Sequence, residues 1–110
     1  MNATAPQRQK IWQNLISIND LEPGDVTPVK FGSREFAIFD AKHGVCVSIS
    51  RCPHGAADLC DGYFDGTYIE CPLHQGLYDV RDGTAKAAPA RRPLLMIQTR
   101  VSDGFIQIYI

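Results

Sequence analysis

Two short clusters of cysteine and histidine constrain this chain more than any other feature of its sequence. The first is Cys-Pro-His at residues 52–54, the second is Cys-Pro-Leu-His at residues 71–74, and the sixteen residues 55–70 lie between them. Each cluster offers one thiol and one imidazole. The candidate ligands of a metal centre are therefore Cys52, His54, Cys71 and His74.

A mixed set of soft thiolates and imidazoles suits two kinds of centre, iron–sulfur and zinc. Structural zinc sites usually pair like with like, with cysteines two to four residues apart and histidines three to five apart. Neither pair here is homogeneous. A dinuclear [2Fe–2S] centre of the Rieske type accounts for the pattern, because two cysteines hold one of its irons and two histidines the other. A zinc-stabilised interaction module with unusual ligand spacing is the alternative that remains open.

The pattern resembles the Rieske ferredoxins, and above all the small ferredoxin components of bacterial aromatic-ring-hydroxylating dioxygenase systems. The resemblance covers residues 21–110 and is most specific at residues 51–55, 62–66 and 70–76. Residues 86–90 are similar to the family's third, proline-containing loop, which covers the cluster. The resemblance implies that Cys52 and Cys71 hold the inner iron of one [2Fe–2S] cluster, and that His54 and His74 hold the outer, solvent-facing iron.

The same resemblance implies a one-electron carrier that is not itself an enzyme. Such a protein takes electrons from a flavin-containing NAD(P)H-dependent reductase and passes them to the terminal Rieske oxygenase. An oxygenase also needs a mononuclear iron held by two histidines and a carboxylate. Only His43 remains after the four candidate ligands are assigned, so this chain cannot supply that second site. The alternative within the family is the small Rieske-like subunit of an NADH-dependent nitrite reductase.

Four positions bear on the redox potential that the resemblance implies. The high-potential branch of the family has a disulfide at the positions of Ala57 and Leu73, and a serine that bonds a cluster sulfide at the position of Gly76. Their absence predicts a low potential, near the lower end of the Rieske range at about −150 mV. Tyr78 stands where that branch has a tyrosine bonded to a ligand cysteine. Its hydroxyl either makes this bond, which would raise the potential, or is held elsewhere in the core.

Charge and hydropathy exclude several classes of partner. Eleven basic and 12 acidic residues give a formal net charge of −1, which argues against nucleic acid and membrane surfaces as partners. No apolar run approaches the length of a transmembrane helix, and residues 1–10 lack the apolar segment of a signal peptide. We expect a cytoplasmic monomer with one domain over residues 1–110, of which 1–10 are a loose N-terminal segment. In the cytoplasm, Cys46 and Cys60 are expected to be free thiols.

Two sets of residues are candidates for contact with redox partners. Asp58, Asp61 and Asp65 form either an ordinary solvated loop surface or an acidic face that attracts a basic partner. A small, partly apolar patch around the histidines suits brief electron-transfer contacts. Its expected members are Pro53, Pro72, Leu73, Gln75 and Pro89.

Many short strands and frequent turns predict an all-β fold, a Rieske-type antiparallel β-sandwich with a cluster-binding subdomain of hairpin loops. A strand containing Pro28 is expected at an edge, and Asp-Gly pairs mark turns. Residues 9–16 fit either a helix or the entrance to a strand. The expected strands begin at residue 16 and then cover 26–29, 35–39, 45–49, 77–80, 94–101 and 105–110, with a hairpin over 63–70.

Overall fold

The computed structural model describes residues 9–53, 55, 57–73 and 75–110. The N-terminal segment expected to be loose lies outside these residues except for its last two positions, and so do His54 and His74. The described residues form strands and two short 3₁₀-helices, with no α-helix among them, which confirms the all-β prediction. None of the described helices is long and apolar enough to cross a membrane.

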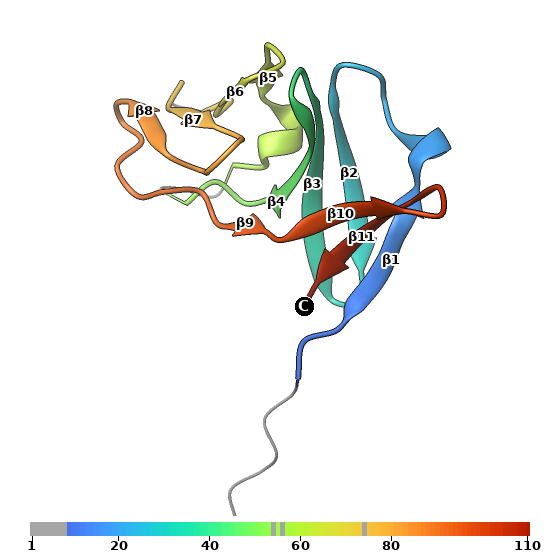
Figure 1. The fold of residues 1–110 in the computed structure, drawn as a ribbon. Coiled ribbons are helices and arrows are strands. Elements are labelled where there is room, and N and C mark those ends of the chain that lie inside the picture. The colour runs from blue at the N-terminus through green and yellow to red at the C-terminus, as the bar shows by residue number, and fades with distance from the viewer. Residues whose placement is uncertain (1–8, 54, 56, 74) are drawn as a thin grey trace, which may run out of the picture.

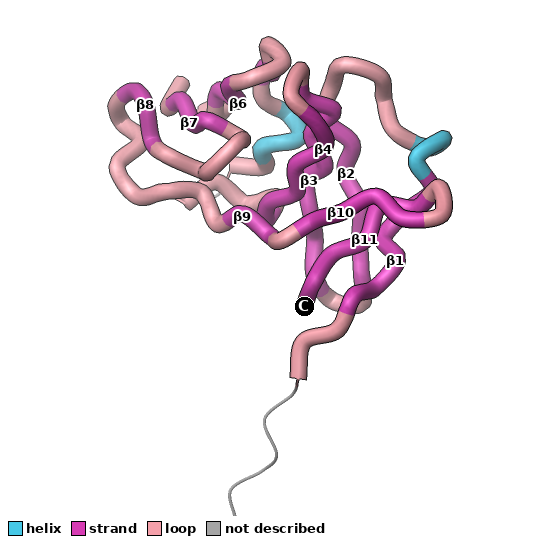
Figure 2. The backbone as a smooth tube through the Cα atoms, in the orientation of Figure 1, coloured by secondary structure: helices cyan, strands magenta, loops and turns pink. Residues whose placement is uncertain are grey.

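The described strands form three antiparallel sheets (Figures 1 and 2). The first sheet has the order β1-β11-β10, the second β2-β3-β4-β9, and the third β5-β6-β7-β8. The element bounds are β1 (Trp12–Ser17), η1 (Ile18–Asp20), β2 (Val26–Phe31), β3 (Arg34–Ala41), β4 (Gly44–Ile49), η2 (Leu59–Asp61), β5 (Tyr63–Phe64), β6 (Tyr68–Glu70), β7 (Leu77–Asp79), β8 (Ala85–Ala87), β9 (Met96–Ile97), β10 (Thr99–Ser102) and β11 (Phe105–Tyr109).

Local sequence explains most of the strand pairing. β10 and β11 are joined by Asp103-Gly104, whose φ values of 53° and 79° suit the two-residue hairpin turn that Asp-Gly favours. β5 and β6 pair around the Asp65-Gly66 turn, as the sequence predicts. Pro28 lies in β2, and β2 is an edge strand of its sheet, which confirms that prediction as well.

Two strand predictions are wrong in their boundaries. The strand expected to begin at residue 16 begins at Trp12 and ends at Ser17, whose side chain caps η1 by accepting from the Asn19 N–H. The ambiguous stretch 9–16 is therefore largely strand β1. The single strand expected over residues 94–101 is divided at Gln98, because β9 pairs with β4 whereas β10 pairs with β11.

The second sheet separates two apolar cores. Between it and the first sheet lies a core of Phe36, Ile38, Val47, Ile106 and Ile108, all fully buried. Between it and the third sheet lies a larger core, whose buried members are Val26, Ala37, Phe39, Ala41, Cys52, Ala57, Leu59, Phe64, Ile69, Cys71, Tyr78, Val80, Ala90 and Leu94. β3 supplies alternate residues to the two cores, because successive side chains of a strand point to opposite faces. Both candidate cysteines belong to the larger core.

Candidate metal centre

The first cysteine loop follows β4 and is closed by its own backbone. The Cys52 N–H donates to the Ala57 carbonyl at 2.9 Å, and the Gly55 N–H donates back to the Cys52 carbonyl at 3.3 Å. An isolated β-bridge between Arg51 and Asp58 seals the base of the loop. These bonds fix the cysteine at the start of a short turn.

The second cysteine loop repeats this construction between β6 and β7. The Cys71 N–H donates to the Gly76 carbonyl at 2.8 Å, and the Gln75 N–H donates to the Cys71 carbonyl at 3.0 Å. In both loops the cysteine N–H thus bonds the carbonyl five residues further on. Gln75 has a φ of 61°, a left-handed conformation that is uncommon for a residue with a side chain. The two loops therefore hold their cysteines in matching backbone environments.

Both cysteine side chains are buried in the larger core, with 1% of each residue exposed. A buried thiol is a soft ligand protected from water, which suits the inner iron of an iron–sulfur centre. The described residues of the site therefore fit the cluster that the sequence predicts. His54 and His74, the other two predicted ligands, lie outside the described residues.

Tyr78 brings a hydroxyl to the first of these cysteines. It is fully buried on β7, and its Oη lies 3.6 Å from Cys52 Sγ, within hydrogen-bonding distance for sulfur. Burial first, and then the hydrogen bond with Cys52, raise the pKa of the Tyr78 phenol. Of the two roles open from the sequence, the structure favours the bond to the candidate ligand Cys52.

The third loop lies directly against the second cysteine loop. A Cβ atom placed on Gly76 would be 3.1 Å from Ala90 Cβ and 3.2 Å from Ala90 N, so a side chain there would require Ala90 to shift by a few tenths of an ångström. Ala90 is itself 92% buried, with 8% exposed. The sequence prediction of a proline-containing loop covering the centre agrees with this contact, although part of that stretch forms strand β8.

The predicted contact residues that are described lie mostly at the surface. Leu73 is 60% exposed, Pro72, Gln75 and Pro89 are exposed, and Pro53 is half-buried. An additional exposed aromatic, Tyr63, is 68% exposed on β5. The tip of the second loop thus carries the apolar surface that the sequence predicts.

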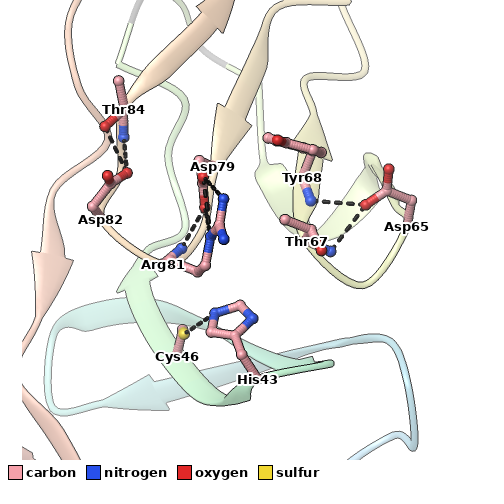
Figure 3. Close-up of polar contacts among 9 residues, drawn as sticks. All are labelled: His43, Cys46, Asp65, Thr67, Tyr68, Asp79, Arg81, Asp82 and Thr84. Atoms are coloured by element: carbon pink, nitrogen blue, oxygen red, sulfur yellow. Dashed lines mark hydrogen bonds and ion pairs between the residues drawn. The ribbon is translucent and has the colours of Figure 1, made fainter.

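Two of the three acidic residues have local structural roles in addition to any role with partners. Asp58 caps η2 by accepting from the Cys60 N–H at 2.8 Å. Asp65 accepts from the backbone N–H groups of Thr67 and Tyr68, which lower the pKa of its carboxyl (Figure 3). Asp61 is exposed in η2. Their positions are therefore compatible both with an ordinary solvated loop surface and with an acidic face that attracts a basic partner.

The remaining cysteines and the third histidine form no metal site. Cys46 and Cys60 are free thiols, and burial, followed by the charge of Asp58, raises the pKa of Cys60 to about 12. Cys46 Sγ lies 3.6 Å from His43 Nε2 (Figure 3). Among the described residues, no group of three potential ligands is close enough to hold a metal ion.

An ion pair between a buried aspartate and a half-exposed arginine lies at the end of the strand that carries Tyr78. Asp79 is 2% exposed and is held by Arg81, whose Nη2 donates to Oδ2 at 2.6 Å and whose Nε donates to Oδ1 at 3.0 Å (Figure 3). The hydrogen bonds from Arg81 hold the pKa of the Asp79 carboxyl below its usual range. The sequence analysis did not identify this pair, although side chains two residues apart along an extended chain point to the same side.

Sequence comparisons place the chain among known iron–sulfur proteins. A family model described as the Rieske [2Fe–2S] domain matches residues 11–103. The chain is 33% identical over 97 residues to a Pseudomonas putida protein named as the ferredoxin component of a naphthalene 1,2-dioxygenase system. That match covers 88% of this chain and 93% of the relative.

Structural comparisons agree with the sequence matches. The chain superposes on a ferredoxin of Sphingomonas yanoikuyae B1 with a TM-score of 0.83 and 33% identity, covering 89% of this chain and 97% of that one. It also matches a chain from a complex of reduced oxygenase and oxidised ferredoxin in carbazole 1,9a-dioxygenase (TM-score 0.81, 29% identity, 90% and 93% coverage). A nitrite reductase small subunit gives a TM-score of 0.73 over 89% and 97% of the two chains, but at 20% identity it shares the fold alone.

Proposed function

This chain belongs to the Rieske [2Fe–2S] domain family, and on that basis we propose that it is the ferredoxin of an aromatic-ring-hydroxylating dioxygenase system. Its cofactor is one Rieske-type [2Fe–2S] cluster. The bound cluster supplies one reversible one-electron step, and the protein supplies its position, its potential and a docking surface.

We assign the cluster ligands as Cys52 and Cys71 on the inner iron and His54 and His74 on the outer iron. The two matching loops support the cysteine assignment, because they bury both thiols beside Tyr78. The family's donor set of two cysteines and two histidines supports the histidine assignment. No other histidine of the chain is near enough to a second cysteine, aspartate or glutamate to form a competing site within the described residues.

The observation that carries the functional proposal is the nearly end-to-end match with ferredoxins. This chain covers 93% of the naphthalene system's ferredoxin component and 97% of the Sphingomonas ferredoxin. Relatives of that length and identity favour an electron carrier over the nitrite reductase subunit, for which the likeness is one of fold. They also favour a carrier without a catalytic site of its own.

The electron would enter and leave through protein partners. A reduced flavin in an NAD(P)H-dependent reductase gives up one electron, the cluster is reduced by it, and a terminal Rieske oxygenase then takes the same electron. We place this exchange in the cytoplasm and expect a monomer with a single domain. The net charge of −1 gives no support to nucleic acid or membrane partners.

Spectroscopy of the purified protein tests the cofactor and its ligands together. We expect a red-brown protein that, after dithionite, gives a rhombic EPR signal with an average g below that of all-cysteine [2Fe–2S] proteins. H54C and H74C should each shift this signal towards the all-cysteine type or lose the cluster, whereas C46S should leave it unchanged. A colourless protein with stoichiometric zinc would overturn the proposal.

Electron transfer is tested by anaerobic stopped-flow mixing. A dioxygenase-system reductase with NADH should reduce one cluster per chain with uptake of one electron, and a reduced sample should be reoxidised by a terminal oxygenase. Stable co-purification with a sirohaem subunit, together with failure in both half-reactions, would favour the nitrite reductase alternative instead.

A further inference from the structure

The three residues that follow the third loop form an exposed segment held at both ends. Ala90, just before this segment, is buried and its N–H donates to the Ala87 carbonyl at 3.0 Å. Leu94, just after it, is 2% exposed and its N–H donates to the Gly83 carbonyl at 2.7 Å. Residues 91–93, Arg-Arg-Pro, are all exposed between these anchors. In Figure 1 the stretch between β8 and β9 runs around the outer edge of the third sheet.

This exposed segment begins next to the second cysteine loop. Ala90 is in close contact with Gly76, where an added Cβ would come within 3.2 Å of its backbone nitrogen. The Gly76 carbonyl in turn accepts the hydrogen bond from the Cys71 N–H that closes the loop. Arg91 therefore directly follows Ala90, which contacts the loop that holds Cys71, a proposed cluster ligand.

The two arginines have no acidic partner within the described part of the protein. Neither forms an ion pair or a side-chain hydrogen bond there. Asp82 lies in the turn on which Leu94 rests, but its carboxylate accepts from the Thr84 N–H and hydroxyl at 2.9 and 2.6 Å. Lys86 of β8 is also exposed, and its charge acts on Asp79 and Asp82. The local charge is thus positive although the whole chain carries −1.

We propose that Arg91 and Arg92 form a dibasic docking site, beside the cluster, for a carboxylate-bearing surface of a redox partner. The inference rests on the electron-carrier function proposed above. Arginine forms paired hydrogen bonds with carboxylates, and the two anchors present both side chains at little cost in backbone entropy. Charge at this position guides the partner to the side of the molecule where the electron is exchanged, which raises the association rate.

Small charged oxidants measure this local charge without a protein partner. The reduced protein is mixed with ferricyanide, which is anionic, or with hexaamminecobalt(III), which is cationic, over a range of ionic strengths. The wild-type rate with ferricyanide should fall as salt is added. In R91E/R92E it should be about tenfold lower at low ionic strength and should rise with salt, because attraction has become repulsion. The rate with hexaamminecobalt(III) should change in the opposite direction.

A matched variant separates local charge from net charge. K10E/R100E makes the same change in net charge on β10 of the first sheet and just before β1. The first sheet contributes no residue to the core around the cysteines. Its rates should stay within about twofold of wild type. Equal effects of the two double variants, or no effect of R91E/R92E, would overturn the proposal. If R91E/R92E keeps the wild-type EPR signal and midpoint potential, the carrier itself is intact. Absence of the expected rate effect would then count against the docking site and not against the proposed electron-carrier function.

The partner is tested with the reductase and oxygenase half-reactions. At low ionic strength R91E/R92E should slow transfer with at least one of the two proteins by about tenfold, and the difference should vanish in high salt. R91K/R92K keeps the charge but loses the paired geometry, so it should recover most of that rate but not all of it. Wild-type rates for R91E/R92E with both proteins would contradict a docking role.

Discussion

At the scale of single residues, Tyr78 is the point where the apolar core and the metal centre meet. Its ring fills the core between the second and third sheets, and its hydroxyl reaches Cys52 Sγ at 3.6 Å. A hydrogen bond to a thiolate ligand stabilises the electron-rich, reduced state of an iron–sulfur centre. The other positions that bear on the redox potential, Ala57, Leu73 and Gly76, predict a low value.

We predict that Tyr78→Phe lowers the midpoint potential. Removing the hydroxyl deletes a bond to a charged sulfur at almost no cost in volume, and a loss of about 1.4 kcal/mol corresponds to about 60 mV for one electron. Voltammetry of the purified variant measures the shift. Tyr63→Phe is the control, because Tyr63 is 68% exposed and should leave the potential unchanged. Equal potentials for wild type and Tyr78→Phe would show that the hydroxyl does not act on the cluster.

The Asp79–Arg81 pair predicts a specific dependence of stability on pH. The pKa of Asp79 is lowered, so the folded protein holds its carboxylate ionised more firmly than the unfolded chain does. Its stabilising contribution is complete above the ordinary value of 3.8 and is lost as the pH falls through the folded pKa.

Asp79→Asn should therefore reduce stability at pH 7 by roughly 1–2 kcal/mol, because the buried end of the pair loses its charge-assisted bonds while Arg81 stays half-exposed to water. Thermal unfolding at pH 7 and below pH 4 measures the effect. The difference in melting temperature between wild type and variant should narrow in acid. Asp82→Asn should show a smaller difference, because Asp82 is exposed and an asparagine Oδ1 can still accept from the Thr84 N–H and hydroxyl. A gap that widens in acid would contradict this account.

At the scale of structural elements, the proposed centre involves three loops, of which the third packs on the second. Two of them close by the same backbone hydrogen bond from a cysteine N–H. The third packs closely on Gly76, where a Cβ atom would lie 3.1 Å from Ala90 Cβ. Glycine is therefore favoured at this position by close approach, since its φ is not in the left-handed region.

A double-mutant cycle tests this contact. Gly76→Ala should destabilise the protein by about 1–3 kcal/mol, because the new methyl group meets Ala90 at 3.1 Å. Ala90→Gly removes the atom it meets and should restore part of the loss when the two changes are combined. A coupling of at least about 0.5 kcal/mol in chemical or thermal unfolding is expected. Strictly additive effects would mean that the loops are not in contact.

The sequence was sufficient to predict those elements that depend on residues close together in the chain. The Asp103-Gly104 and Asp65-Gly66 turns, the edge position of β2 and the cysteine loops all follow from residues within a few positions of one another. The division at Gln98 does not, because it depends on which distant strand each half pairs with. Arg91 and Arg92 were missed for a similar reason. Their position beside the cysteine loop depends on the packing of Ala90 against Gly76.

At the scale of the whole molecule, the two cores differ in their dependence on the metal centre. The smaller core, between the first and second sheets, contains no cysteine. The larger core contains both Cys52 and Cys71, and it joins buried residues of the second and third sheets. Metal binding and folding should therefore be linked mainly in the larger core.

Removing the cluster should loosen one part of the protein and spare the other. In hydrogen exchange of the apoprotein, β6 and β7 should lose most of their protection, whereas β1 and β11 should keep theirs. Local opening follows the loss of buried contacts, and removing the cluster would remove such contacts only around the cysteines. The holoprotein is the reference. Uniform loss of protection across both cores would show that the molecule folds as one unit with its cluster.

The pairing of β4 with β9 has a consequence for how such a protein can be altered. Val47 lies opposite Ile97 and Ser48 opposite Met96, so the chain leaves the sandwich and returns to it at neighbouring points. The four proposed ligands, the third loop and the proposed arginine docking site all lie in the single stretch 50–95 between those points. That stretch is in effect a cassette with adjacent ends. Exchanging it for the equivalent stretch of another family member would transplant potential and partner preference together, on an unchanged scaffold.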